Sequence, residues 1–260
     1  MEQSTMQGKR VLVTGAGTGI GRGIALEFAQ AGAAVALHYA HSAAGAEAAA
    51  RQINEGGGRA AALGADLGRV ELIAGLAREA REFLGGLDVL VNSAGITMNL
   101  PFARVTAEQF DTLYHVNVRA PFFLTQALLP ALEASKGAVV NISSIHAFEG
   151  YAEHAVYAGT RGAIVAFTRE LAIELAPRGV RVNGIAPGSV EVENYYRVMK
   201  SFDREAAGRG IPAGFVGQPA DIGRVAVFLA SPAARYIVGQ TLIVDVGANV
   251  DCKARHLLEF

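Results

Sequence analysis

The chain has 260 residues, of which 51% are hydrophobic and 18% charged, and its formal net charge is −1. This composition is typical of a packed globular protein, and the balanced charge excludes a basic face for nucleic acid or for an anionic membrane. The start of the chain lacks the apolar stretch of a signal peptide, no segment reaches the length of a membrane span, and the single cysteine, Cys252, excludes an internal disulfide framework. We therefore expect a cytoplasmic protein whose partners are neither nucleic acid nor membrane.

Short apolar runs alternate with helical patterns along the chain. We predict seven strands, at residues 9–14, 34–39, 59–63, 87–91, 138–142, 180–185 and 241–245. We predict helices at residues 19–31, 43–55, 70–84, 106–134, 155–176 and 221–230, and we expect Pro121 and Pro130 to kink the long one at 106–134. This alternation predicts a doubly wound, Rossmann-like α/β fold, in which one parallel seven-stranded sheet carries helices on both faces.

Neither a composition break nor an internal repeat divides the chain, so we expect residues 1–260 to form a single domain. The segment at about 189–219 is irregular and partly helical, and we expect it to cover the ligand site. In parallel α/β sheets, ligands bind beyond the carboxyl ends of the strands. The side chains that follow the predicted strands are therefore the first candidates for function.

The first predicted strand runs directly into a glycine cluster, TGAGTGIG at residues 14–21. Glycines let the backbone approach a phosphate closely, and the N–H groups and dipole of the following helix hold its negative charge. Gly15, Gly19 and Gly21 follow the pattern Thr-Gly-x3-Gly-x-Gly, which differs from the G-x-G-x-x-G dinucleotide fingerprint. Because tight turns use glycine everywhere, this cluster indicates an anion cradle only in combination with other motifs.

A hydroxyl, a phenol and a cation follow the fifth predicted strand. Ser144 comes directly after that strand, Tyr157 lies in the first turns of the next helix, and Arg161 follows one helical turn later on the same face. A nearby cation favours the phenolate form, and a phenolate can take the proton of an alcohol while its hydride leaves for a nicotinamide. The alternative is that Tyr157 and Arg161 are only a pair on a helix surface.

Together these motifs resemble the short-chain dehydrogenase/reductase family over residues 9–247. The resemblance is carried by TGAGTGIG at 14–21, NSAG at 92–95, Ser144, YxxxR at 157–161 and PG at 187–188. It implies an NAD(P)-dependent oxidoreductase that transfers a hydride between a nicotinamide cofactor and a secondary alcohol or carbonyl. Within the family, SSIH at 143–146 and IPAGFVGQP at 211–219 look most like the bacterial glucose 1-dehydrogenase branch, which implies a sugar or polyol as substrate.

The resemblance also implies four catalytic roles. Ser144 orients and polarises the substrate oxygen, and Tyr157 is the acid/base. Arg161 stands where the family pattern has lysine, and Asn117 holds a water for proton relay. A second departure is Val192, which replaces a threonine that contacts the nicotinamide side.

A nicotinamide dinucleotide is therefore the expected cofactor. A carboxylate at the end of the second strand would bond the adenosine ribose and repel a 2′-phosphate. Tyr39 occupies that place, with His41 and Ser42 beside it, so we expect a modest preference for NADP, with NAD still usable. The residues expected to contact the cofactor are Gly15, Thr18, Gly19, Ile20, Gly21, Tyr39, His41, Ser42, Asp66, Leu67, Asn92, Ala94, Gly95, Tyr157, Arg161, Pro187, Gly188 and Val190.

Polar residues on two segments that should frame the pocket suggest a hydroxyl-rich substrate. Besides Ser144, these are His146, Glu149, His154, Glu193 and Asn194. The alternatives for them are a solvated loop and a surface helix. No metal is expected, because His38 and His41 lack further ligands.

Two other functions compete with the sugar dehydrogenase. One is a dinucleotide-binding protein whose turnover is impaired by Arg161, and the other is a reductase of apolar ketones or acyl carrier substrates. By resemblance we also expect a homotetramer. Six apolar residues on the two long helices are too many to face one sheet, and they are Phe122, Phe123, Leu128, Ile164, Phe167 and Leu171.

Overall fold

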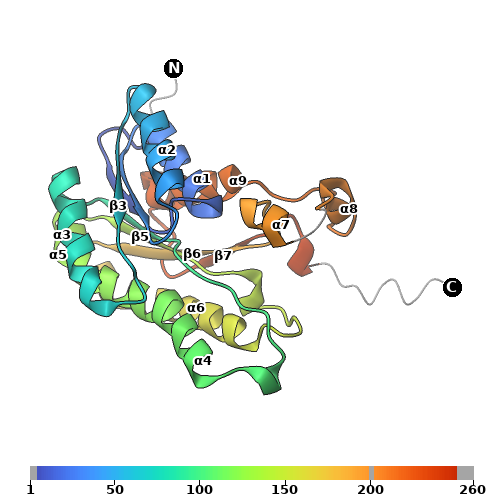
Figure 1. Ribbon diagram of the computed structural model, residues 1–260. Helices are drawn as coiled ribbons and strands as arrows, with labels where there is room; N and C mark the ends of the chain where they lie inside the picture. Colours follow the sequence, from blue (N-terminus) through green and yellow to red (C-terminus); the bar gives the residue numbers. More distant parts are fainter. Residues whose placement is uncertain (1–4, 199–201, 251–260) are drawn as a thin grey trace.

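The computed structural model describes residues 5–198 and 202–250. Its centre is one parallel sheet with the strand order β3-β2-β1-β4-β5-β6-β7 (Figure 1). The strands are β1 (Arg10–Val13), β2 (Ala34–Tyr39), β3 (Arg59–Gly64), β4 (Val89–Asn92), β5 (Ala138–Ile142), β6 (Arg181–Pro187) and β7 (Thr241–Val244). The predicted doubly wound α/β fold is confirmed.

The chain reverses its direction of travel through the sheet between β1 and β4. Leu12 pairs with Ala36 of β2 on one side and with Leu90 of β4 on the other, and all three are buried. Strands covered on both faces need apolar side chains at every position, which is why these runs do not alternate. A crevice forms beyond the carboxyl ends of the strands at such a switch point.

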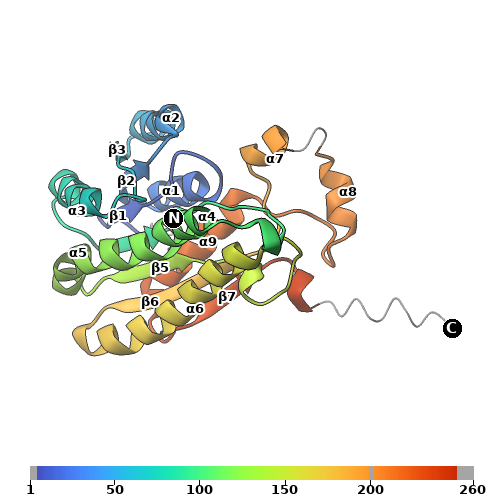
Figure 2. The same cartoon turned by 60° about the horizontal axis from the view of Figure 1, so that its bottom comes forward.

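Helices cover both faces, because successive side chains of a strand point to opposite sides. Val11 and Val13 pack into one core beneath α1 (Gly19–Gln30), α2 (Ala43–Glu55) and α9 (Pro219–Ala230). Leu12 packs into the other core beneath α3 (Val70–Leu84), α5 (Ala120–Ser135) and α6 (Ala155–Leu175). Figures 1 and 2 show these two layers on either side of the sheet.

The predicted helix at 106–134 consists of three parts in the structure. These are α4 (Ala107–Tyr114), a π-helical turn (His115–Arg119) and α5. Pro121 is the second residue of α5, directly after the π-helical turn, and Pro130 lies inside α5. The irregular part of this stretch is therefore the π-helical turn before Pro121, which the sequence did not predict.

The segment predicted to cover the site carries two short helices, α7 (Glu193–Val198) and α8 (Arg204–Arg209). Both extend to the same side of the sheet in the two views (Figures 1 and 2). In the described ranges, no helix is long and apolar enough to cross a membrane.

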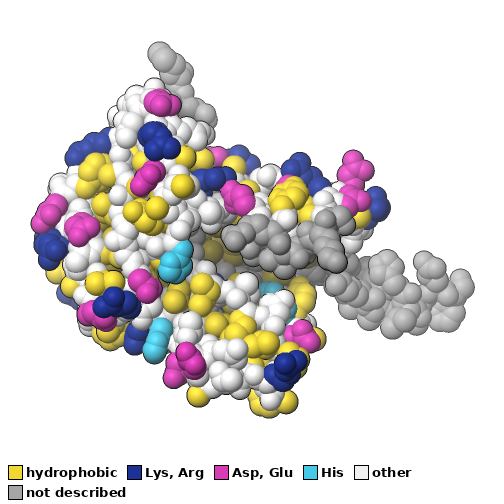
Figure 3. Space-filling view, viewed as in Figure 1, with side chains coloured by type: hydrophobic (Ala, Val, Ile, Leu, Met, Phe, Trp, Pro, Cys, Tyr) yellow, Lys and Arg dark blue, Asp and Glu magenta, His cyan; other side chains and the backbone are white. Residues whose placement is uncertain are grey.

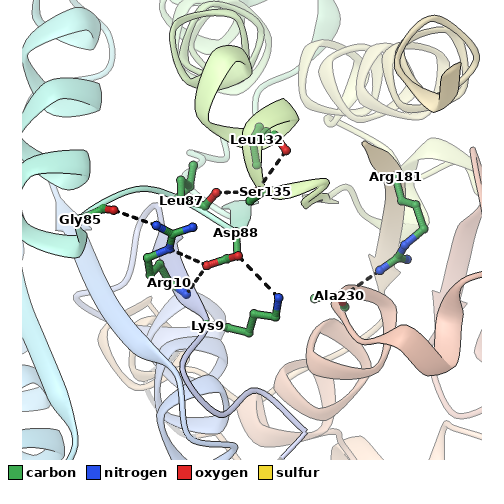
Figure 4. A network of polar contacts seen from close by, with 9 residues as sticks. All are labelled: Lys9, Arg10, Gly85, Leu87, Asp88, Leu132, Ser135, Arg181 and Ala230. Atoms are coloured by element: carbon green, nitrogen blue, oxygen red, sulfur yellow. Dashed lines mark hydrogen bonds and ion pairs between the residues drawn. The ribbon is translucent and has the colours of Figure 1, made fainter. Parts of the chain in front are cut away.

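Charged side chains fasten the amino ends of the central strands. The buried Asp88 accepts hydrogen bonds from the backbone N–H of Arg10 at 2.9 Å and from its Nε at 2.7 Å, and Lys9 lies 3.6 Å away (Figure 4). Burial alone would raise the pKa of Asp88, but the hydrogen bonds from Arg10 outweigh it and leave the pKa lowered. These charged groups therefore hold together the end of the sheet that lies opposite to the crevice.

Candidate active site

The glycine turn lies between the ends of β1 and β4. Thr14 Oγ1 accepts hydrogen bonds from the N–H groups of Ser93 and Ala94, each at 3.0 Å, which ties the TGAGTGIG and NSAG motifs together. Gly15 has a φ of +66°, and a Cβ there would lie 2.8 Å from Ala94 Cα. A Cβ on Gly21 would lie 2.2 Å from the Gly15 carbonyl oxygen. Only glycine fits these two positions.

His38, at the end of β2, supports the same turn. Its Nδ1 accepts the Gly15 N–H at 3.2 Å, and its Nε2 lies 2.9 Å from the Ala65 carbonyl oxygen, so both ring nitrogens are engaged with the backbone. Burial lowers the pKa of His38, and the hydrogen-bond pattern fits a neutral ring protonated at Nε2. The histidine is thus a structural part of the anion cradle.

The residues expected to choose the cofactor lie beside this turn. Tyr39 contacts β3, where a Cβ on Gly64 would lie 3.0 Å from its hydroxyl, and a Cβ on Gly17 would lie 2.0 Å from Ser42 Oγ. His41 is exposed. These side chains bring no carboxylate to the end of β2, as the sequence predicts.

Helix α1 begins at Gly19 without a side-chain cap from Thr18, its N-cap residue. The Gly19 N–H donates instead to Oε2 of Glu193, 2.9 Å away, and the other oxygen of that carboxylate pairs with Arg22. Glu193 is one of the residues predicted to contact the substrate. In the structure its carboxylate lies on the glycine turn, and its contact with a substrate stays a prediction.

Ser144 and Tyr157 line one cavity of about 640 Å³ at the carboxyl end of the sheet. Ser144 follows β5 directly, and Tyr157 lies in the first turn of α6. The surface is hollowed between the α1 side and the α4–α6 side of the molecule (Figure 3). Other predicted site residues on the wall of this cavity are Ile20, His146, His154, Pro187, Gly188 and Val190.

Arg161 is buried, with 7% of its surface exposed. Its Cζ lies 4.9 Å from the ring centroid of Tyr157, and its Nη1 donates to the Ile142 carbonyl oxygen at 3.2 Å. A Cβ on Gly95 would lie 2.2 Å from Nη2. Ser143 Oγ donates to the Arg161 carbonyl oxygen at 2.8 Å. The cation is therefore held between the end of β5, the NSAG turn and Tyr157.

Asn117 lies in the π-helical turn and is buried. Its Nδ2 donates to the Ile96 carbonyl oxygen at 2.9 Å and to Thr160 Oγ1 at 3.1 Å, while its Oδ1 accepts the Ile96 N–H at 2.9 Å. Such π-helical turns are frequent at functional sites. The side chain joins the loop after β4 to α6, and its role in a proton relay stays a prediction.

Four rings cluster at the mouth of the site. The His146 ring centroid lies 4.4 Å from that of Tyr151, 4.6 Å from that of His154 and 5.2 Å from that of Tyr157. Burial, followed by the charge of His154, lowers the pKa of His146 to about 4, so this ring is neutral at pH 7. Burial and a 2.6 Å hydrogen bond to Glu149 raise the pKa of Tyr151 to about 12.

Glu149 and Asn194 are two further residues predicted to contact the substrate, and this stays a prediction for both. Glu149 accepts from the Tyr151 hydroxyl and, through Oε1, from Asn249 Nδ2 at 2.9 Å, and it does not line the cavity. Its carboxylate thus holds Asn249, in the C-terminal part of the described chain, by a hydrogen bond. Asn194 belongs to α7, but its side chain lies outside the described part.

The remaining predicted cofactor residues follow β3, β4 and β6. Asp66 is exposed and accepts the Gly68 N–H at 2.9 Å, whereas Leu67 is buried. Asn92 is buried and donates to Asn141 Oδ1 at 2.8 Å. The others lie close to the ends of β4 and β6, and they are Ala94, Gly95, Pro187, Gly188 and Val190. Their contacts with a cofactor stay predictions.

Eight residues of the cavity wall were not predicted as site residues, and they are Thr97, Asn99, Ser143, Ile145, Tyr151, Ser189, Val192 and Tyr195. Burial raises the pKa of Tyr195, and the neighbouring Tyr157 adds to this effect. Tyr151 and Tyr195 belong to the two segments that the sequence places around the pocket. Thr97 and Asn99 follow NSAG in a loop without any pattern that would have marked them.

Comparisons with known proteins agree with these motifs. The family model described as enoyl-(acyl carrier protein) reductase matches residues 15–249. A hydroxynaphthalene reductase-like protein from Metarhizium brunneum is 36% identical, over 94% of this chain and 96% of its own length. A short-chain dehydrogenase from Burkholderia cenocepacia, solved in complex with NADP, has a TM-score of 0.88 and 34% identity over 94% of this chain and 99% of its own. A 7α-hydroxysteroid dehydrogenase solved with NADH and 7-oxo glycochenodeoxycholic acid also has a TM-score of 0.88 and 34% identity, over 94% and 96% of the two chains.

The chain belongs to the short-chain dehydrogenase/reductase family and is an NAD(P)-dependent oxidoreductase. Its residues fit the dinucleotide that this implies. Gly15 and Gly21 let the turn pack closely against Ala94 and against itself, and the Thr18 side chain does not cap the N-terminus of α1, where the Gly19 N–H is held by Glu193. Backbone donors at a helix N-terminus are the partners that a diphosphate needs.

Proposed function

We propose that this protein reduces a carbonyl group on a ring-shaped, largely apolar substrate, with NADPH as the preferred cofactor. The observation that carries the proposal is that Ser144 and Tyr157 line one cavity whose wall also holds several rings. Apolar cavities with a few polar groups at one place bind apolar ligands and fix their orientation. Ser144 and Tyr157 supply this polar place with their two hydroxyls, and Thr97, Asn99 and His154 add further polar groups to the wall.

The wall of the cavity supports a ring substrate more than a sugar. His146, Tyr151 and Tyr195 present ring surfaces, and His146 is neutral. A sugar would bury several hydroxyls, each costing about 1–3 kcal/mol if it found no partner. The carboxylates of Glu149 and Glu193, on which the sugar prediction partly rests, are turned to other partners. The names of two relatives, a hydroxynaphthalene reductase-like protein and a hydroxysteroid dehydrogenase, point in the same direction.

A nicotinamide dinucleotide, when bound, supplies the hydride that the carbonyl carbon receives. Ser144 Oγ donates a hydrogen bond to the carbonyl oxygen and holds it in place. Tyr157 gives its phenolic proton to that oxygen, so that an alcohol and a phenolate result, and it takes the proton back in the reverse reaction. Arg161 keeps a positive charge over the ring of Tyr157, and Asn117 fixes the loop opposite α6.

The test is a substrate panel followed by absorbance at 340 nm. Bicyclic aromatic ketones and steroid ketones are offered with NADPH and with NADH, and glucose, xylose and polyols with NADP⁺ and NAD⁺. We expect kcat/KM for a bicyclic or steroid ketone to exceed that for any sugar by at least about 10²-fold, as the unmet hydroxyls imply. Preferential oxidation of glucose would overturn the substrate class and restore the sugar prediction.

A dinucleotide-binding protein with impaired turnover is the second candidate. Arg161 favours it, because its Nε is buried without a hydrogen-bond partner in the described structure and its guanidinium cannot release a proton. Dinucleotide binding without hydride transfer to any member of the panel would establish this alternative.

We also propose a cytoplasmic homotetramer. Phe122 and Phe123 on α5 are 45% and 38% exposed, and Phe122 contacts Phe167 of α6 with ring centroids 5.5 Å apart. Leu128 and Ile164 are buried, so fewer of the six apolar residues are exposed on the two helices than the sequence predicts. An apolar patch of this kind is typical of a subunit interface. A monomer in sedimentation at micromolar concentration would contradict the assembly.

A further inference from the structure

Helix α7 folds back onto the glycine turn and brings an anion to the start of α1. Oε2 of Glu193 accepts the Gly19 N–H at 2.9 Å, and the Arg22 side chain pairs with the same carboxylate. No acidic residue lies in the first turn of α1, and Thr18 does not cap it. Glu193 therefore supplies, from 174 positions further along the chain, the negative charge that this helix end lacks.

A phosphate group can bind the same partners as this carboxylate. It binds backbone N–H groups at a helix N-terminus and pairs with arginine. A diphosphate bound to the Gly19 N–H would have to displace Glu193, since one N–H cannot serve both anions at full strength. Displacement would also free Arg22, whose guanidinium already lies within contact of an anion at this place.

We propose that Glu193 is an internal ligand of the diphosphate subsite, and that Arg22 is a further cofactor-binding residue that exchanges Glu193 for the cofactor. The proposal rests on the proposed function, because it requires that a dinucleotide binds at the glycine turn. The two side chains are 41% and 44% exposed, so their ion pair is weak and yields to a diphosphate with two negative charges.

The exchange reaches the substrate cavity through α7. Just before this helix, the buried Glu191 accepts from Gln218 Nε2 at 2.8 Å and pairs with Arg204, so the entry to the segment stays fastened. Val192 lies between this anchor and Glu193 and lines the cavity that holds Tyr157. Val192 thus links the carboxylate on the glycine turn to the wall of the substrate cavity.

The test measures binding to the full chain by calorimetry, so that it does not depend on turnover. The probes are NADP⁺, ADP and adenosine. We expect Glu193→Gln to bind NADP⁺ and ADP about 3- to 30-fold more tightly than the parent, because no internal anion has to be displaced. Adenosine has no phosphate, so its affinity stays unchanged. Glu205→Gln, at an exposed carboxylate of α8, is the matched control and leaves all three affinities unchanged.

The role of Arg22 is tested in the Glu193→Gln background, where it no longer has its internal partner. We expect Arg22→Gln to weaken NADP⁺ and ADP binding at least about fivefold there, whereas Arg78→Gln on α3 has no effect. Unchanged or weaker ADP binding by Glu193→Gln would overturn the internal ligand. A neutral Arg22→Gln in that background would overturn its contact with phosphate. If neither the parent nor any variant bound NADP⁺ or NADPH, the proposed function itself would fall, which is a different result from either of these.

Discussion

The guanidinium of Arg161 lies over the ring of Tyr157, with its Cζ 4.9 Å from the ring centroid. A cation in this position is attracted to the face of the ring and places a fixed positive charge beside the phenol. The charge is permanent, since arginine keeps its proton at any working pH. Arg161 can therefore stabilise a negative charge on Tyr157, but it cannot pass a proton on.

We expect Arg161→Lys to raise turnover, while dinucleotide affinity changes little. An ammonium group can release and regain a proton through water, which guanidinium does not do. Proton transfer by a positioned group is worth about 10²–10⁴-fold, so restoring it should speed hydride transfer by a part of that range. Single-turnover hydride transfer in a stopped-flow instrument measures the effect directly.

The control for this experiment is Tyr157→Phe in both backgrounds. Phenylalanine keeps the ring under the cation and removes only the hydroxyl, so activity should disappear with arginine or with lysine at position 161. A lysine variant that transfers hydride at the parent rate or more slowly would mean that the site is adapted to arginine, and the relay argument would be wrong.

A second prediction concerns the stability of the glycine turn. At Gly15, φ is +66° and a Cβ would lie 2.8 Å from Ala94 Cα, so Gly15→Ala should lower the free energy of unfolding by about 1–3 kcal/mol. The displaced turn should also weaken NADP⁺ binding more than about tenfold. Gly75→Ala is the matched control, because a Cβ there meets open space inside α3 and should add about 0.5–1 kcal/mol of stability. Urea denaturation and calorimetry distinguish the two variants, and equal behaviour would refute the argument.

Cofactor choice should depend on the charge at the end of β2. We expect the parent to use NADP⁺ with a higher kcat/KM than NAD⁺, because Tyr39 brings no carboxylate against the 2′-phosphate. Tyr39→Asp should reverse this preference, since its carboxylate can bond the ribose hydroxyls and repel the phosphate. Tyr39→Asn introduces a side chain of the size of aspartate but without its charge, so its preference for NADP⁺ over NAD⁺ should lie between those of the parent and Tyr39→Asp. A parent enzyme that prefers NAD⁺ would contradict this account.

Much of the fold could be predicted from the sequence because its signals are local. The run from Val11 to Val13 is apolar at every position and a glycine follows, so a buried strand and its end were both visible. Ser144 and Tyr157 could be brought together on the same grounds, since both follow the end of one strand. In each case, a pattern within about twenty residues determines the position.

The parts that could not be predicted depend on long-range contacts of single side chains. Glu193 turns to Gly19 rather than to the cavity, and Glu149 turns to Asn249, 100 positions away. No periodicity encodes such a direction. The π-helical turn around Asn117 was missed for a related reason, since one extra residue in a turn leaves no signal in the apolar pattern.

The lowered pKa of His146 gives a prediction for acid stability. Its folded-state pKa of about 4 lies below its ordinary value of 6.5, so the unfolded chain takes up the proton first as the pH falls. His146 should therefore cost stability progressively between about pH 6.5 and 4. In His146→Gln, the free energy of unfolding should fall less steeply over this range than in the parent. The exposed His41 offers a control, and His41→Gln should keep the parent slope; an equal slope in both variants would contradict the prediction.

Asp88, at the other end of the sheet, should also make the protein less stable as the pH falls, but in a more acidic range. It receives two hydrogen bonds from Arg10 and lies 3.6 Å from Lys9, and together these lower its pKa although burial opposes them. A group with a depressed folded-state pKa stabilises the protein above its unfolded value, and the contribution is lost as the pH falls through the folded value. Asp88→Asn should therefore reduce the free energy of unfolding at pH 7 by about 1.5–3 kcal/mol, the usual loss for a hydrogen bond to a charged group.

This difference between Asp88→Asn and the parent should begin to narrow as the pH falls below about 4, because the unfolded parent then takes up the proton on Asp88 before the folded parent does. Urea denaturation at pH 7, 5 and 3.5 provides the measurement, with Glu79→Gln, at an exposed carboxylate of α3, as the control. Since Asp88 lies at the end of the sheet opposite to Tyr157, kcat of the remaining folded enzyme should not change. A difference as large at pH 3.5 as at pH 7 would mean that shape rather than charge holds Arg10 in place.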